Sequence, residues 1–259
     1  MKKSWLAMAV IVSLLFQIGI ASALTAGEAK QDWLSAMQTW ISADAAYKQA
    51  QLDYAGNKIP ENEQKVIDTA KEVLSAALDE AEAWLKWKNQ EAKESDVPQE
   101  LRGNIDNDVD KNLVKIETLR QDVARIKTRL DVAGVFLKMV GSYVELLTDV
   151  ARNTGAVWVN LGNQIADKTA DYEIKLRTTA NGMVDNAAIL AKLDIAKSEI
   201  DLARTQINAA DTAYKLVALP GTPFVKFAEG NSYLRQARVN LFAAAEQLQG
   251  VFNLIISGN

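Results

Sequence analysis

The feature that most constrains this chain is a seven-residue apolar repeat inside a stretch without proline. The 259-residue sequence has prolines only at positions 60, 98, 220 and 223, so residues 99–219 contain none. Within that stretch, largely apolar residues recur at the a and d positions of eight heptads in one register, as helix packing requires. The a positions are Val109, Ile116, Val123, Leu130, Leu137, Val144, Ala151, Trp158 and Ile165. The repeat predicts one very long central helix, or two collinear ones, over 98–181, about 120 Å at ~1.5 Å per residue.

A helical hairpin is predicted on the N-terminal side, over residues 24–97. Its first helix should end near Gly56, and Pro60 fits the first turn of a second helix that continues to about Glu94.

A second hairpin is predicted over residues 182–259. Asn181-Gly182 ends the long helix, and a proline-rich turn separates the last two helices. The core line of the first of them is Ile189, Leu193, Ala196, Ile200, Ala203, Ile207, Ala210, Tyr214 and Val217. No segment alternates like a strand, so the predicted fold class is all-α: an elongated antiparallel helical bundle or coiled coil of about five helices.

Two layouts fit this pattern. In one, two three-helix bundles share the central helix, a layout that resembles spectrin-type repeats in its helices and heptads alone. In the other, the long helix bends and the chain forms one compact bundle. Gly134, Gly141 and Asn153-Thr154-Gly155 are the positions where the long helix is expected to break if it is not continuous.

Two heptad lines stand out, one because its residues are large aromatics and the other because its residues are glycines. Trp33, Trp40, Tyr47 and Tyr54 lie seven residues apart, and an alanine line accompanies them. Gly134, Gly141, Gly155 and Gly162 share one line of the long helix. Small residues let helix axes approach closely while large ones fill the gaps beside them. We therefore interpret these eight residues as a helix-packing seam rather than a ligand platform.

The N-terminus is typical of a secretory signal peptide. Lys2 and Lys3 precede an uncharged apolar run over 5–20, and Ala21-Ser22-Ala23 matches a cleavage site. Cleavage near Ala23 would release a secreted, periplasmic or cell-surface protein; an uncleaved membrane anchor is the alternative. Removing Lys2 and Lys3 changes the formal net charge from −4 to −6.

Composition argues against most catalytic chemistry. The chain has no cysteine and no histidine, so it lacks disulfides, the commonest general base and the commonest zinc ligand. No nucleophile or phosphate-binding motif occurs, and no basic cluster alternates with aromatics as in nucleic-acid binding. We predict no enzyme activity, no cofactor and no nucleic-acid partner.

One acidic stretch is a weak calcium candidate. Asp106, Asp108, Asp110 and Glu117 have the spacing of an EF-hand loop. Lys111 stands where that loop needs glycine, so we predict no metal site and interpret these residues as a solvated helix turn.

The predicted function is an exported, non-catalytic helical scaffold or interaction protein of the cell envelope or extracellular space, with a protein partner or self-association. The first alternative is a membrane-active bundle, pore-forming or lipid-binding, because Val132–Leu147 is the most apolar segment after the N-terminal run. The second is a calcium-stabilised surface protein.

Overall fold

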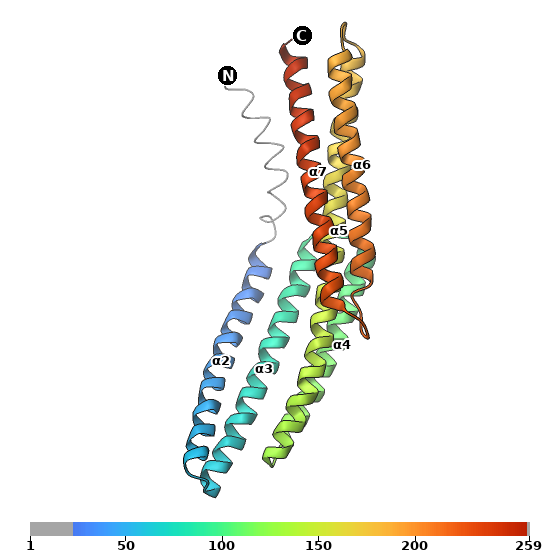
Figure 1. The fold of residues 1–259 in the computed structure, drawn as a ribbon. Coiled ribbons are helices and arrows are strands. Elements are labelled where there is room, and N and C mark those ends of the chain that lie inside the picture. Colours follow the sequence, from blue (N-terminus) through green and yellow to red (C-terminus); the bar gives the residue numbers. More distant parts are fainter. Residues whose placement is uncertain (1–22, 258–259) are drawn as a thin grey trace. The chain divides into compact units, whose positions relative to one another are not determined.

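A computed structural model describes residues 23–257, which form six α-helices and no strand (Figure 1). The helices are α2 (Ala23–Gly56), α3 (Pro60–Glu94), α4 (Gln99–Ala124), α5 (Arg129–Asn181), α6 (Ala187–Lys215) and α7 (Pro223–Ser257). The predicted all-α class is confirmed for this part of the chain. Apart from Ala23, the predicted signal peptide lies outside the described residues.

The chain divides into two compact units. The N-terminal unit ends at Val150 and contains α2, α3, α4 and the first part of α5. The C-terminal unit begins at Ala151 and contains the rest of α5 with α6 and α7. The division falls inside α5.

The prediction of one helix over 98–181 is wrong at residues 125–128, where a turn separates α4 from α5. Helix α4 ends in tight turns, in which the amides of Arg125 and Ile126 bond back only three residues. Thr128 and Asp131 then cap α5: the amide of Asp131 donates to Thr128 Oγ1, and Asp131 Oδ2 accepts from the amides of Lys127 and Thr128. This reciprocal arrangement is a capping box, which starts a new helix.

The heptad pattern does not reveal this turn, because the apolar residues next to the turn are buried as they would be in a continuous helix. Val123 and Ile126 flank the end of α4 and both lie in the core. The break falls at none of the predicted positions, since Gly134, Gly141 and Gly155 all lie within α5.

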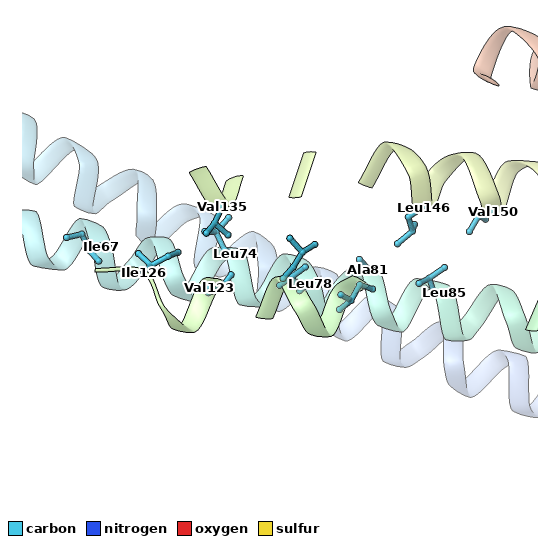
Figure 2. Close-up of a cluster of buried hydrophobic side chains, with 12 residues drawn as sticks. Ile67, Leu74, Leu78, Ala81, Leu85, Val123, Ile126, Val135, Leu146 and Val150 are labelled. Carbon is cyan, nitrogen blue, oxygen red and sulfur yellow. The ribbon is translucent and has the colours of Figure 1, made fainter. Parts of the chain in front are cut away.

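The core of the N-terminal unit is built by α3, α4 and α5 (Figure 2). Its buried residues are Ile67, Leu74, Leu78, Ala81, Leu85, Ile116, Leu119, Val123, Ile126, Val135, Leu146 and Val150. Helix α2 contributes none of them. It packs closely on α3, and Ala50 is the one buried residue of its described side chains, 26–56.

The C-terminal unit pairs α6 closely with α7. All nine residues of the predicted core line from Ile189 to Val217 are buried, so that prediction is confirmed. Tyr214 is 1% exposed, and its ring lies against the backbones of Gly155 on α5 and Gly230 on α7.

Candidate functional site

The N-terminal unit contains a large open cleft with a volume of about 1060 Å³. Helices α2 and α5 contribute its aromatic residues, and α3 and α4 contribute small and aliphatic ones. The principal lining residues are Met37, Trp40, Tyr47 and Tyr54 of α2, Ala70, Leu74 and Ala77 of α3, Ile116 and Leu119 of α4, and Val132, Phe136, Val140 and Tyr143 of α5. The cleft is thus mainly apolar, as ligand pockets usually are.

The sequence produces this cleft through two helix faces. On α2, Trp40, Tyr47 and Tyr54 recur every seven residues and so lie along one side of the helix. On α5, Phe136, Val140 and Tyr143 follow three-four spacing. These two faces line the cleft and leave it open.

Several large side chains of the cleft remain exposed. Trp40 is 40% exposed, Phe136 54%, Val140 46% and Tyr143 43%. Contiguous exposed apolar surface of this kind marks interaction or ligand sites in soluble proteins. These residues are therefore available to an occupant.

One end of the cleft is cationic. Arg129, at the start of α5, holds its guanidinium 4.8 Å from the ring centre of Tyr54. Lys58, in the turn after α2, also lines this end. Neither cation makes an ion pair with any carboxylate that the structure describes.

The other end holds an acid and buried polar groups. Glu80 Oε1 accepts a 2.5 Å hydrogen bond from the indole of Trp33. Burial and the negative charge of Glu80 raise the pKa of Tyr143. Asn112 is 2% exposed; its Nδ2 donates to Asp149 Oδ2 at 3.0 Å, and its Oδ1 has no partner in the described part of the chain.

The structure separates the four residues of the predicted aromatic seam. Trp33 stacks on Trp87 of α3 with ring centres 4.9 Å apart, under the ammonium of Lys88. Trp40, Tyr47 and Tyr54 line the cleft instead.

The four glycines of the predicted seam also differ in what surrounds them. Gly155 lies against Tyr214, and Gly162 lies against Ile207. A Cβ on Gly134 or Gly141 would meet no atom of the described chain within 4 Å.

The calcium candidates lie on helix α4 rather than in a loop. Asp106 pairs with Lys93 at 3.0 Å, and Glu117 lies 3.6 Å from Arg120. Asp108 and Asp110 belong to the same helix, which does not wrap around an ion as an EF-hand loop does. No group of three or more metal-ligating side chains gathers anywhere in the described residues.

Within residues 23–257, one helix is long and apolar enough to cross a bilayer, by length and composition alone. This is α7, over Pro223–Ser257. Its apolar line Ala237, Leu241, Ala244, Leu248 and Val251 is buried in the C-terminal unit.

No protein family, curated protein sequence or solved structure matches this chain. Sequence reasoning found the aromatic line but missed the cleft, Lys58 and Arg129. The capping box at Thr128 was the available signal, because it places Arg129 at a helix start beside the α4–α5 turn.

Proposed function

We propose that this chain is an exported, non-catalytic helical binding protein that works through the cleft of its N-terminal unit. The observation that carries the proposal is the cleft itself, about 1060 Å³ of mainly apolar space with exposed aromatic walls. Covering apolar surface is favourable by about 25 cal/mol per Å². A molecule with a long apolar face therefore gains most of its binding energy there.

The wider role in this proposal is that of a scaffold in the cell envelope or extracellular space, with a protein partner or a second copy of the chain. Its antiparallel coiled-coil helices hold the partner, and α5 belongs to both units. The absence of histidine and cysteine from the sequence is in keeping with holding rather than transforming a partner.

Site-specific photocrosslinking in the source organism tests this role. We would replace Trp40 by the photoreactive residue p-benzoylphenylalanine and use Leu202 of α6 as control, since it is similarly exposed, at 47%. The Trp40 position should give an adduct of defined mass after irradiation, and Leu202 should not. Equal labelling at both positions, or none at Trp40, would contradict the proposal.

Export is tested separately by sequencing the N-terminus of the protein recovered from outside the cytoplasm. Cleavage at the predicted site gives a chain that begins at Leu24. An intact Met1 in that material would favour the uncleaved anchor.

A membrane-active bundle is the second candidate, favoured by the exposed apolar face of Val132–Leu147. Leu137, 70% exposed, extends that face beyond the cleft lining. Flotation with liposomes, with tryptophan emission recorded in parallel, separates the two functions. A membrane-active protein floats and its emission shifts to the blue, whereas a cleft-binding protein stays in the aqueous fraction.

A further inference from the structure

We propose that the cleft is a site for an anionic single-chain amphiphile, with the acyl chain along the aromatic walls and the head group at Lys58 and Arg129. This inference rests on the proposed binding role of the cleft and names its ligand class. Three features carry it: the dimensions of the cleft, its neutral middle and the two cations that line one end.

The dimensions suit a lipid chain. Met37 and Tyr54 both line the cleft and are separated by 17 positions of α2, or about 26 Å at ~1.5 Å per residue. One bilayer leaflet places acyl chains over half of a ~30 Å core, about 15 Å. The cleft therefore accommodates one acyl chain together with its head group.

The volume of the cleft suits a small ligand. Small-molecule pockets typically span about 300–1,000 Å³, and the cleft lies at the top of this range.

Asp44, in the middle of the cleft, is already neutralised, since it pairs with Lys48 at 2.6 Å. Nearer the end that holds Asn112, Lys115 pairs with Glu145. The remaining wall is mainly aromatic and aliphatic, so an uncharged acyl chain is accommodated there.

Lys58 and Arg129 line the head-group end, and neither of the cleft-lining acids, Asp44 and Glu80, lies there. Asp53 is paired with Lys65 at 2.8 Å, and Asp131 Oδ2 caps the backbone of Lys127 and Thr128. Lys58 and Arg129 therefore present donors to a carboxylate or phosphate, which both side chains bind well. Glu80 at the opposite end repels an anion, which fixes the direction of the ligand.

Binding to the full mature chain tests the proposal with a matched set of probes. Tetradecanoate and tetradecanoyl lysophosphatidic acid carry anionic heads, 1-tetradecanol is neutral, and tetradecyltrimethylammonium is cationic. Each is titrated below its critical micelle concentration, and tryptophan emission and calorimetry follow binding. Both anions should bind at least roughly tenfold tighter than the alcohol, as a charge-assisted contact predicts, and their order distinguishes a free fatty acid from a phospholipid head.

Two variants locate the head and the chain. The double variant Lys58→Gln/Arg129→Gln should weaken anion binding roughly tenfold and leave the alcohol unchanged. Lys168→Gln/Lys175→Gln on α5 is the matched control and should change neither. Val140 is half exposed, so its position tolerates a charge, and Val140→Asp should weaken the binding of all four amphiphiles. Circular dichroism confirms that this variant keeps its fold.

The outcomes separate this inference from the proposed function. Equal affinity for anionic, neutral and cationic probes would overturn the head-group assignment while leaving the cleft as a binding site. No binding of any probe, with crosslinking at Trp40 intact, would overturn the amphiphile and leave the proposed function standing. Binding that Val140→Asp does not affect would place the ligand outside the cleft and overturn the inference.

Discussion

The ring of Tyr214 occupies the space that a side chain on Gly155 would fill. A Cβ built on Gly155 would lie closer than 3.0 Å to that ring, and a Cβ on Gly230 would do the same from α7. The Tyr214 hydroxyl donates a 2.6 Å hydrogen bond to Asn231 Oδ1, which holds the ring in place. Two glycines and one tyrosine thus set how closely α5 and α7 approach α6 at this level.

Replacing Gly155 by alanine should destabilise the C-terminal unit. The added methyl meets a ring that cannot move toward Gly230, and overpacking of this kind costs about 1–3 kcal/mol. Gly141→Ala on the same helix is the control. Its Cβ meets no described atom within 4 Å, so better helix propensity should stabilise it by up to about 1 kcal/mol. Urea unfolding followed by circular dichroism measures both, and a Gly155→Ala protein as stable as Gly141→Ala would refute the packing argument.

Tyr214→Phe should remove a pH-dependent part of the stability. Burial raises the pKa of Tyr214 to about 12, against the opposing positive charge of Arg235. Below pH 10 both folded and unfolded chains keep the phenol proton. Between about pH 10 and 12 the unfolded chain loses it first, so the free energy of unfolding falls by about 2–3 kcal/mol as pH rises.

The comparison of wild type with Tyr214→Phe isolates this effect from lysine titration. The phenylalanine variant should lose about 1 kcal/mol at neutral pH, where the hydrogen bond to Asn231 is broken. Its deficit should shrink as pH rises above 10. A deficit that stays constant to pH 12 would show that Tyr214 titrates normally in the folded state.

Thr128→Ala should weaken the start of α5 by about 0.5–2 kcal/mol, because Thr128 Oγ1 accepts from the amide of Asp131. Thr118→Ala is the matched control, since its hydroxyl only bonds back to Val114 within α4. Thermal unfolding at pH 7 compares the two, and equal melting temperatures would argue against the capping box.

Asp131→Asn adds a pH test of the same cap. The amide of Lys127 and then the hydroxyl of Thr128 lower the pKa of Asp131 below its usual value. The contribution of this carboxylate is therefore complete above its unfolded pKa and is lost as pH falls through the lowered folded pKa. Wild type should lose stability over this acidic window relative to Asp131→Asn.

Helix boundaries and the C-terminal core could be predicted from sequence because local chemistry decides them. Gly56 and Pro60 bracket a turn, Asn181 ends a helix, and the line from Ile189 to Val217 has one orientation compatible with burial. The α4–α5 turn was missed because burial of Val123 and Ile126 satisfies the heptad pattern on both sides of it. Apolar periodicity in a sequence indicates which residues are buried. A short turn whose neighbouring residues stay buried does not change that periodicity.

The cleft was missed for a different reason. A heptad aromatic line has the same sequence signature whether it faces another helix or an open groove. The structure distinguishes Trp33, which stacks on Trp87 and bonds to Glu80, from Trp40, which remains 40% exposed. Whether an aromatic residue of α2 packs against a helix or faces the groove depends on where α5 lies relative to α2 within this unit.

The different surroundings of Trp33 and Trp40 predict that Trp33 contributes to stability and Trp40 to binding. Trp33→Ala should cost about 2–3 kcal/mol, less than the ~3–5 kcal/mol of a fully buried tryptophan, because it loses a stacked ring and a hydrogen bond. Trp40→Ala should cost under about 1 kcal/mol, as expected for an exposed position, and should weaken amphiphile binding. Urea denaturation and probe titration measure the two effects, and the reverse ranking of stability would identify Trp40 as structural.

Helix α2 is one wall of the cleft, yet it shares no residue with the core of its unit. Detaching it breaks its contact with α3, which includes the stacked pair of Trp33 and Trp87, and leaves the buried cluster of α3, α4 and α5 intact. Local opening of α2 should therefore require less free energy than global unfolding, and its amides should exchange with deuterium sooner than those of α3. A long-chain ligand would then enter sideways as one helix swings out, and its residence time would report the closing of that helix rather than the melting of the protein.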